Sequence, residues 1–350
     1  MMKITWSRMT LKMARPFRTS KAVRTDKETI WVIVHDDGVR GSGEVVPMDT
    51  YRQTLDSAEL TLSKIAARAY WNAEELGSAI EGLTGKYGDQ LATVAGLDAA
   101  FLDWQGKKRG QPTWRGVGVT DTSLPLTSFS LGLESDLDLL AGLVRDAASF
   151  PILKIKLGTE QDERILEVIR REAPTAIIRV DANMAWSVDE ALNKLPILAK
   201  YDVEFVEQPL AADDLEGLRK LKQAGVLPIV ADESCVRPDD IERLVGHVDG
   251  INIKLSKCGG IRQGLEMIRR AREAGLRIML GCMVESSLGI AAALQLGPLV
   301  DWLDLDGHLL LAEDPFSGIG GAGGVLRLST EPGLGVFPRQ FRNPAATLSS

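Results

Sequence analysis

PILKIKLG, at residues 151–158, is the first of five short apolar runs that follow one another through the middle of the chain. The others are AIIRVDAN at 176–183, VEFVEQPL at 203–210, LPIVADES at 227–234 and GINIKLSKCGG at 250–260. Amphipathic stretches such as DERILEVIRREA lie between them, with apolar residues three and four positions apart. Further runs extend the alternation to eight strand candidates: LTSFSL at 126–131, RIMLGCMVE at 277–285 and VDWLDLDG at 300–307. Eight strands that alternate with helices predict an α/β fold whose parallel strands close into a barrel.

The two ends of the chain have other patterns. Alternating strand-like runs around a turn at Asp37-Gly38 come first, and helical spacing follows up to Lys108. A Gly- and Pro-rich tail, in which GVLRLST is the one strand candidate, comes after the last run of the barrel. We therefore expect three parts: an α+β domain at 1–122, the barrel at 123–314, and a segment at 315–350 that packs back on the first domain.

Composition limits the class of protein. The 350 residues include 41 Lys and Arg against 48 Asp and Glu, a net charge of −7, and 45% are hydrophobic. This balance indicates a globular protein that binds neither nucleic acid nor an anionic membrane. Three separated cysteines, without a signal-like apolar start or an 18-residue apolar stretch, favour a reducing, cytoplasmic compartment. We also expect a homo-oligomer.

Charged residues recur at the ends of the barrel strands. They stand 22 to 26 residues apart, one per strand–helix unit, at Lys156, Asp181, Glu207, Asp232 and Lys254, and the last strand ends with Asp304 and Asp306. In such a barrel the carboxyl ends of the strands face the active site. A ring of buried charges is costly unless it binds something, so this ring is the candidate site.

Three of these residues are carboxylates on adjacent strands. Asp181, Glu207 and Asp232 would repel one another unless a cation or protonation relieves the repulsion. An all-oxygen set without nearby His or Cys suits Mg²⁺ better than zinc. The alternative is three independent helix caps or surface acids.

The lysines suggest proton transfer. Lys154 and Lys156 are two apart in one strand and therefore share a face, and Lys254 comes four units later, across the barrel mouth. Two lysines on opposite sides of a substrate can each remove or deliver a proton on one face, which a 1,1-proton transfer at a stereocentre requires. A pair of lysines extending to solvent from a strand end is the alternative for Lys154 and Lys156.

The same motifs resemble a known family. KIK at 154–156, VDAN at 180–183, VEQPL at 206–210, ADES at 231–234 and NIKLSKCGG at 252–260 resemble the enolase superfamily, within it the muconate-lactonizing-enzyme subgroup. AGLDAAFLDWQGKKRGQP, at 95–112, is similar to the last helix of that subgroup's capping domain. The resemblance implies a (β/α)7β modified TIM barrel with an N-terminal α+β capping domain. It also implies a Lys base and Mg²⁺ that stabilises an ene-diolate.

The motif in the eighth predicted strand indicates which reaction of the subgroup the chain resembles most. Asp304 and Asp306, in LDLDGHLLLAEDP, resemble the Asp-x-Asp pair of dipeptide epimerases of the L-Ala-D/L-Glu type. Two carboxylates away from the metal need a cation, and the α-ammonium of a dipeptide supplies one. The alternative is that one Asp caps the next turn and the other is solvated. His308 departs from the proline usual after that glycine, which leaves the substrate's first residue open.

Other site residues follow only from the resemblance. Lys154 would support the substrate, and Asn183 and Glu233 would orient the metal ligands. Glu285, at the end of strand seven, matches a glutamate common in the subgroup and would bind the substrate. Arg24 falls where related epimerases of acidic dipeptides carry an arginine on a mobile capping loop. A solvated basic loop with Lys21 and Lys27 is the alternative there, and residues 46–52 resemble a second capping loop.

The implied reaction is Mg²⁺-dependent epimerisation of a dipeptide at the α-carbon of its C-terminal residue. Alternatives on the same barrel are a cycloisomerase, an o-succinylbenzoate synthase and an N-acylamino acid racemase, whose substrates lack the ammonium. A catalytically silent barrel that acts as a binding protein is a further alternative, against which the intact lysines and carboxylates argue. The G-x-G-x-x-G match at 318–323 follows the last barrel strand and does not open a strand–helix unit, so it does not indicate a dinucleotide site.

Overall fold

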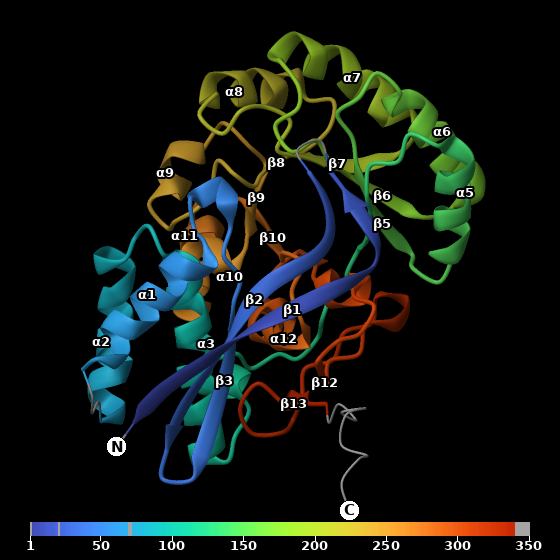
Figure 1. The fold of residues 1–350 in the computed structure, drawn as a ribbon. Coiled ribbons are helices and arrows are strands. Elements are labelled where there is room, and N and C mark those ends of the chain that lie inside the picture. The colour runs from blue at the N-terminus through green and yellow to red at the C-terminus, as the bar shows by residue number, and fades with distance from the viewer. Residues whose placement is uncertain (1, 20–21, 69–71, 340–350) are drawn as a thin grey trace, which may run out of the picture.

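The computed structural model describes residues 2–19, 22–68 and 72–339. Its centre is an eight-stranded parallel sheet in which each strand pairs with the next, from β4 to β11 (Figure 1). The strands are β4 (Phe129–Leu131), β5 (Ile152–Lys156), β6 (Ile177–Asp181), β7 (Val203–Glu207), β8 (Ile229–Ala231), β9 (Gly250–Ile253), β10 (Arg277–Gly281) and β11 (Trp302–Asp304). A parallel bridge between Thr127 and Leu303 joins the two edges. The predicted α/β barrel is therefore confirmed.

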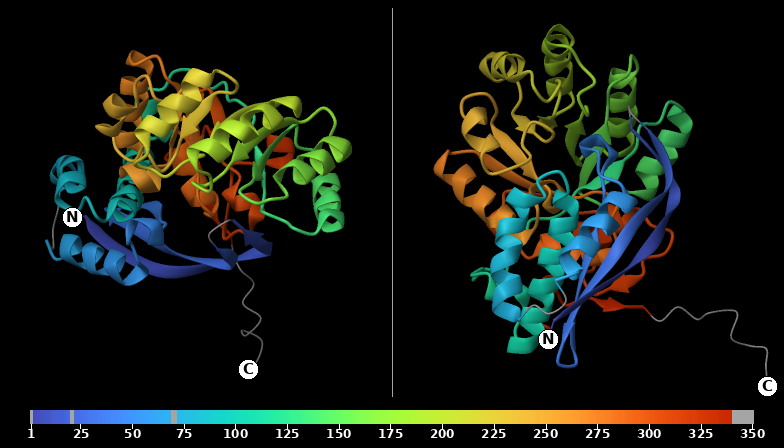
Figure 2. Two further views of the ribbon diagram at one scale, coloured as in Figure 1. Left: turned by 90° about the horizontal axis from the view of Figure 1, so that it is seen from above. Right: turned by 60° about the vertical axis from the view of Figure 1, so that its left-hand side comes forward.

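Helices surround this barrel (Figure 2). They are α5 (Leu137–Asp146), α6 (Asp162–Glu172), α7 (Val188–Lys200), α8 (Leu215–Ala224), α9 (Asp240–Leu244), α10 (Leu255–Cys258), α11 (Ile261–Glu273) and α12 (Ser287–Leu294). Most bury one apolar stripe, as in α11, where Ile261, Gly264, Met267 and Ala271 face inward. Helix α12 is buried along its whole length because it lies between the barrel and the N-terminal sheet.

The N-terminal part is an antiparallel sheet covered by helices. Its elements are β1 (Lys3–Arg18), β2 (Val23–Asp36), β3 (Val39–Val45), η1 (Asp49–Tyr51), α1 (Leu55–Ala66), α2 (Ala73–Lys86), α3 (Leu91–Arg109) and α4 (Thr113–Gly116). Asp37 and Gly38, both at positive φ, make the expected two-residue turn between β2 and β3. Helix α3 approaches β3 so closely that a Cβ at Gly41 would lie 2.1 Å from the Ala100 carbonyl oxygen, so the strand needs glycine there.

The long β1–β2 pair crosses the barrel and lies against its strand ends (Figures 1 and 2). Backbone hydrogen bonds fix it there: Leu133 N donates to Arg18 O at 2.7 Å, and Ala312 N donates to Lys12 O at 2.8 Å. This placement brings the segments around Arg24 and Tyr51 over the ring of charged residues. The N-terminal part therefore forms one wall of the site.

The C-terminal segment contacts the N-terminal part, as far as it is described. Its elements are β12 (Phe316–Ser317), η4 (Ala322–Gly324) and β13 (Phe337–Pro338), whereas the short turns η2 (Gly297–Leu299) and η3 (Gly307–Leu310) flank β11 in the barrel part. Leu334 N donates to Asp103 Oδ1 of α3 at 2.7 Å, and Trp114 Nε1 donates to Ser329 O at 2.9 Å. Residues 340–350 of the expected segment lie outside the described residues. The strand expected at GVLRLST is wrong, because that stretch makes a single bridge from Leu326 to Gly320.

Five of the glycines in the loop at 318–324 have positive φ, and the loop opens no strand–helix unit. None of the helices in the described ranges is long and apolar enough to span a membrane.

Candidate active site

The predicted charged residues meet at one end of the barrel. Lys156, Asp181 and Glu207 are the last residues of their strands. Three placements differ slightly from the prediction: Asp232 and Lys254 follow β8 and β9 directly, and Asp306 lies two residues beyond β11. A cavity of about 230 Å³ opens above this end, between the barrel and the N-terminal part.

Three buried carboxylates form a convergent oxygen cluster. Atoms of Asp181, Glu207 and Asp232 all lie within 4.8 Å of one another. Burial and the neighbouring Asp181 raise the pKa of Glu207 to about 8. Burial would raise the pKa of Asp232 too, but Lys254 and Lys257 hold it well below its usual range. Crowded oxygen donors without nitrogen or sulfur fit a hard divalent cation such as Mg²⁺.

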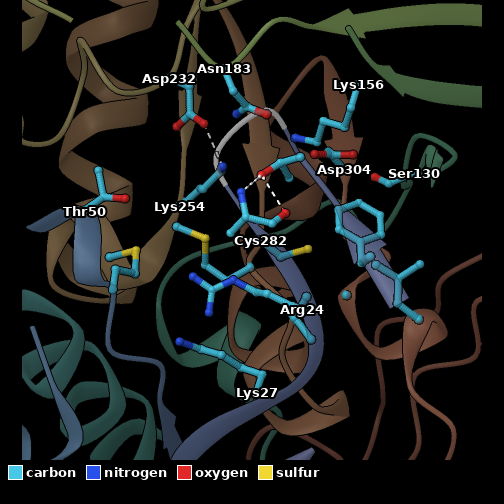
Figure 3. Close-up of a pocket in the computed structure, with 18 of the residues that line it drawn as sticks. Arg24, Lys27, Thr50, Ser130, Lys156, Asn183, Asp232, Lys254, Cys282 and Asp304 are labelled. Carbon is cyan, nitrogen blue, oxygen red and sulfur yellow. Dashed lines mark hydrogen bonds and ion pairs between the residues drawn. The ribbon is translucent and has the colours of Figure 1, made fainter. Parts of the chain in front are cut away.

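The three predicted lysines pair with these carboxylates. Lys156 Nζ lies 2.5 Å from Asp181 Oδ2, and Lys254 Nζ lies 2.7 Å from Asp232 Oδ2. Figure 3 shows the two lysines reaching into the cavity from different sides. Lys154, which is fully buried, lies 2.6 Å from Glu207 Oε2. The geometry thus places two amino groups at the cavity, each beside a different carboxylate of the cluster.

A fourth lysine was missed by the sequence reasoning. Lys257 Nζ lies 2.5 Å from Asp232 Oδ1 and donates to the carbonyl oxygens of Asp232, Cys235 and Asn252. It is 2% exposed, so its ammonium is held by these oxygens and not by solvent. Its spacing of three from Lys254 in an apolar stretch was the available signal. Lys257 and Lys254 hold the two oxygens of Asp232 from opposite sides.

Two amides also escaped the sequence reasoning. Asn252 Nδ2 donates to Glu207 Oε1 at 2.7 Å. Gln208 accepts hydrogen bonds from the backbone N–H groups of Asp232 and Ser234, at 2.8 and 3.1 Å. Both side chains fix the orientation of the carboxylate cluster.

The two residues predicted to orient the metal ligands are also at the cavity. Asn183 and Glu233 line it, and the backbone N–H of Asn183 donates to Asp181 Oδ1 at 2.9 Å. Asn183 has a positive φ of 46°, which is less costly for Asn than for most other residues.

Asp304 and Asp306 both line the cavity, as expected, but their surroundings differ. Asp304 Oδ2 lies 2.6 Å from Lys154 Nζ, and Ser128 Oγ donates to Asp304 Oδ1 at 2.6 Å. Asp306 Oδ2 accepts from the Ser130 N–H at 2.6 Å. Burial and the neighbouring Asp304 raise the pKa of Asp306 to about 7. Asp304 is therefore already paired with a cation, whereas Asp306 is the carboxylate that a ligand's cation would stabilise.

His308 follows this pair. Its Nε2 lies 2.9 Å from the Gly320 carbonyl oxygen, and burial lowers the pKa of the imidazole. His308 therefore faces the glycine-rich loop, and it is not among the described residues that line the cavity.

The N-terminal part contributes cations to the other side of the cavity. Arg24 and Lys27 lie together there (Figure 3), and Arg24 Nη2 is 3.7 Å from Asp49 Oδ2 of the second capping loop. Lys27 Nζ donates to Pro47 O at 2.5 Å, and burial together with Arg24 lowers the pKa of Lys27. Lys21 lies outside the described residues.

Glu285 is placed differently from the prediction. It lies four residues beyond β10 and is not among the residues that line the cavity. Its Oε1 accepts from Met283 N at 2.8 Å. The other oxygen of Glu285 and Glu44 Oε2 both lie next to Gly289, where a Cβ atom would be within 3.1 Å of each. Burial and Glu44 raise the pKa of Glu285 to about 8. The loop beside the cavity is joined to β3 by Glu44, which accepts from the backbone N–H groups of Ser286 and Gly289, while Glu285 bonds within the loop.

A serine caps the start of α12. Ser286 is the N-cap residue, and its hydroxyl accepts from Leu288 N.

Known proteins share this architecture. A sequence profile described as Enolase C-terminal domain-like matches residues 138–341. An L-Ala-D/L-amino acid epimerase from Maribacter sp. is 37% identical over 97% of this chain and 100% of its own length. The crystal structure of a dipeptide epimerase from Enterococcus faecalis, complexed with Mg and the dipeptide L-Leu-L-Tyr, is 29% identical with a TM-score of 0.90 and covers 95% of this chain and 98% of its own. The structure of an N-succinyl Arg/Lys racemase from Bacillus cereus is 25% identical with a TM-score of 0.88 and covers 96% of both chains.

Proposed function

The chain belongs to the enolase C-terminal domain-like family, and we propose that it is a Mg²⁺-dependent dipeptide epimerase. The reaction inverts the α-carbon of the C-terminal residue by a 1,1-proton transfer through an ene-diolate. One observation carries the proposal: two lysines, Lys156 and Lys254, reach one cavity from different sides beside a cluster of three carboxylates. The relatives named as epimerases support it.

Asp181, Glu207 and Asp232 would hold one Mg²⁺ per subunit, since their oxygens converge and favour a hard cation over softer metal ions. The bound ion would supply positive charge that stabilises the ene-diolate. Asn252, Gln208 and Lys257 keep the three carboxylates in place.

The lysines would move the proton. One removes the α-proton from one face and the other delivers a proton to the opposite face, and the roles exchange in the reverse direction. Lys154, whose Nζ lies 2.6 Å from both Glu207 and Asp304, would provide fixed positive charge between them and support the substrate from the side.

Two further contacts would select a dipeptide. The substrate's ammonium would lie against Asp306 with Asp304 behind it, which fixes the register of the peptide. Arg24 and Lys27 would face the side chain of the C-terminal residue, and their charge favours an acidic side chain such as glutamate.

Deuterium exchange tests the reaction directly. We expect L-Ala-L-Glu in D₂O with Mg²⁺ to gain deuterium at the α-carbon of glutamate while the D-epimer accumulates, and excess chelator to stop both processes. N-acyl amino acids and cycloisomerase substrates, tested in parallel, separate the alternatives. Full activity with excess chelator, or turnover of the N-acyl amino acids alone, would exclude the proposed reaction.

Three further properties remain part of the proposal. The free cysteines Cys235, Cys258 and Cys282 support a reducing, cytoplasmic compartment. A homo-oligomer is expected and can be measured by light scattering. The division at residues 122/123 and 314/315 agrees with the separate N-terminal and barrel sheets.

A further inference from the structure

Tyr51 places a hydroxyl group at the cavity that has no role in the reaction described so far. The residue ends η1 on the second capping loop and lines the same cavity as Lys254 and Asp232. Among the described residues that line the cavity, Tyr51 has the one buried hydroxyl without a hydrogen-bond partner. A buried, unpaired phenol is costly to a folded protein, so a hydroxyl in this position calls for a functional explanation.

The loop that carries Tyr51 is rigidly built. Tyr51 N donates to Met48 O at 2.9 Å, Arg52 N donates to Asp49 O at 2.9 Å, and Gln53 N donates to Met48 O at 3.1 Å. Arg52 has a positive φ of 57°, which closes the turn at some cost in strain. The hydroxyl is therefore held in position before any ligand arrives, as a binding group should be.

The Tyr51 hydroxyl is a donor, because a phenol has an ordinary pKa of about 10 and keeps its proton at neutral pH. The charged groups that face it are Asp232 and Glu233 on the loop after β8 and Lys254 on the neighbouring strand. Lys257, which also lines the cavity, carries a charged ammonium that cannot accept a hydrogen bond. In the structure the Tyr51 hydroxyl pairs with none of these groups, so an oxygen of the ligand can accept its proton.

We propose that the Tyr51 hydroxyl donates a hydrogen bond to an oxygen of the substrate's C-terminal carboxylate. This inference rests on the proposed function, in which the bound Mg²⁺ stabilises the ene-diolate that forms from this carboxylate, in the cavity that Tyr51 and Lys254 both line. Negative charge on the carboxylate oxygens grows as the α-proton leaves, so the hydrogen bond strengthens in the transition state. Tyr51 is then a substrate-binding residue that contributes to kcat and sets the position of the reacting carbon.

The Tyr51→Phe variant tests the inference because it removes only the hydroxyl. We expect kcat for dipeptide epimerisation to fall about tenfold, the loss that one hydrogen bond to a charged group gives, with a smaller rise in KM. The Mg²⁺ dissociation constant should stay unchanged. The Tm of the substrate-free variant should rise, by about 1–3 °C, because an unpaired buried donor has been removed.

Tyr201→Phe is the matched control. The Tyr201 hydroxyl lies 3.5 Å from Glu167 Oε1 on the outside of the barrel, so its loss should leave kcat, KM and the Mg²⁺ affinity as in the parent. Unchanged kcat in Tyr51→Phe, or a lower Tm together with weaker Mg²⁺ binding, would overturn the inference and make Tyr51 irrelevant or merely structural. A parent enzyme that turns over no dipeptide would overturn the proposed function, and this inference with it.

Discussion

Lys154 Nζ lies 2.6 Å from Asp304 Oδ2, and this ion pair makes the two aspartates after strand β11 chemically different. Burial would raise the pKa of Asp304, but Lys154 holds it below its usual range, whereas burial and Asp304 raise the pKa of Asp306 to about 7. Asp306 therefore gains most when a ligand brings a positive charge. The sequence alone treats the two as an equivalent pair.

Replacing Asp306 should weaken the use of free dipeptides. We expect Asp306→Asn to lower kcat/KM about ten- to a hundredfold, since a charged hydrogen bond contributes about 1.5–3 kcal/mol. In the parent, kcat/KM should rise as pH increases through about 7, because Asp306 must be ionised to bind an ammonium. Kinetics from pH 6 to 8 measure both effects.

N-acetylated dipeptides provide the matching control. They lack the ammonium, so Asp306→Asn should change their already slow turnover little. A parent that prefers N-acyl amino acids to free dipeptides would contradict the assigned role of Asp306 and favour an N-acylamino acid racemase.

The two lysines should separate the two half-reactions. We expect Lys254→Ala to lose epimerisation in both directions while still exchanging the α-proton of one epimer through Lys156, because exchange needs only one base. Lys156→Ala should show the opposite preference. NMR in D₂O with each pure epimer gives the measurement, and exchange of the same epimer by both variants would rule out bases on opposite faces.

Each carboxylate of the cluster should be required for the metal. Asp181→Asn, Glu207→Gln and Asp232→Asn should each weaken Mg²⁺ binding by more than about a hundredfold, since even residues that only orient ligands contribute about ten- to a hundredfold. Calorimetric titration of Mg²⁺ measures this without turnover. Asp162→Asn is a control, because Asp162 is also buried and pairs with Lys194 at 2.7 Å, but outside the site. Its Mg²⁺ affinity should match the parent's.

Arg24 should determine the preference for acidic side chains. We expect Arg24→Gln to lower kcat/KM for L-Ala-L-Glu about three- to tenfold, a modest factor because the Arg24 side chain is 43% exposed and screened by solvent. Turnover of L-Ala-L-Leu should stay the same or improve. Equal losses for both dipeptides would show that Arg24 does not contact the side chain.

The junction between α3 and α11 should make stability depend on pH. Asp98 on α3 accepts from Ile261 N at 2.7 Å and lies 3.1 Å from Arg262 Nη1, and burial raises its pKa from 3.8 to about 6. A raised carboxyl pKa means that the folded state binds the proton more tightly than the unfolded state. Protonation of Asp98 therefore stabilises the fold, fully below pH 3.8, and this contribution is lost as pH rises through about 6.

The measurable effect is the pH dependence of the difference in the free energy of unfolding between the parent and Asp98→Asn. From pH 4 to pH 6 the parent should lose up to about 3 kcal/mol relative to the variant, since one pKa unit corresponds to about 1.4 kcal/mol. Urea unfolding at several pH values measures it. A difference that does not vary with pH would show that Asp98 keeps an ordinary pKa.

Much of the fold and site was predictable because a barrel repeats one structural unit. Asp181, Glu207 and Asp232 recur at the same place in successive units, and equivalent places in a parallel barrel meet at one end. The alternation of runs therefore identified the barrel, the oxygen cluster and the sides from which Lys156 and Lys254 approach. No long-range pairing had to be known for this, since the period along the chain already orders the strands.

The tertiary structure alone decided the contacts between residues that do not occupy equivalent positions in the repeated strand–helix units. Lys257 beside Asp232, Lys154 beside Asp304 and Tyr51 at the cavity depend on how turns and side chains pack around the strand ends. Glu285 follows the sequence motif but turns toward Glu44 of the N-terminal sheet. A period along the chain determines which strand end a residue occupies, but the direction of its side chain depends on neighbours distant in sequence, and only the folded structure brings these together.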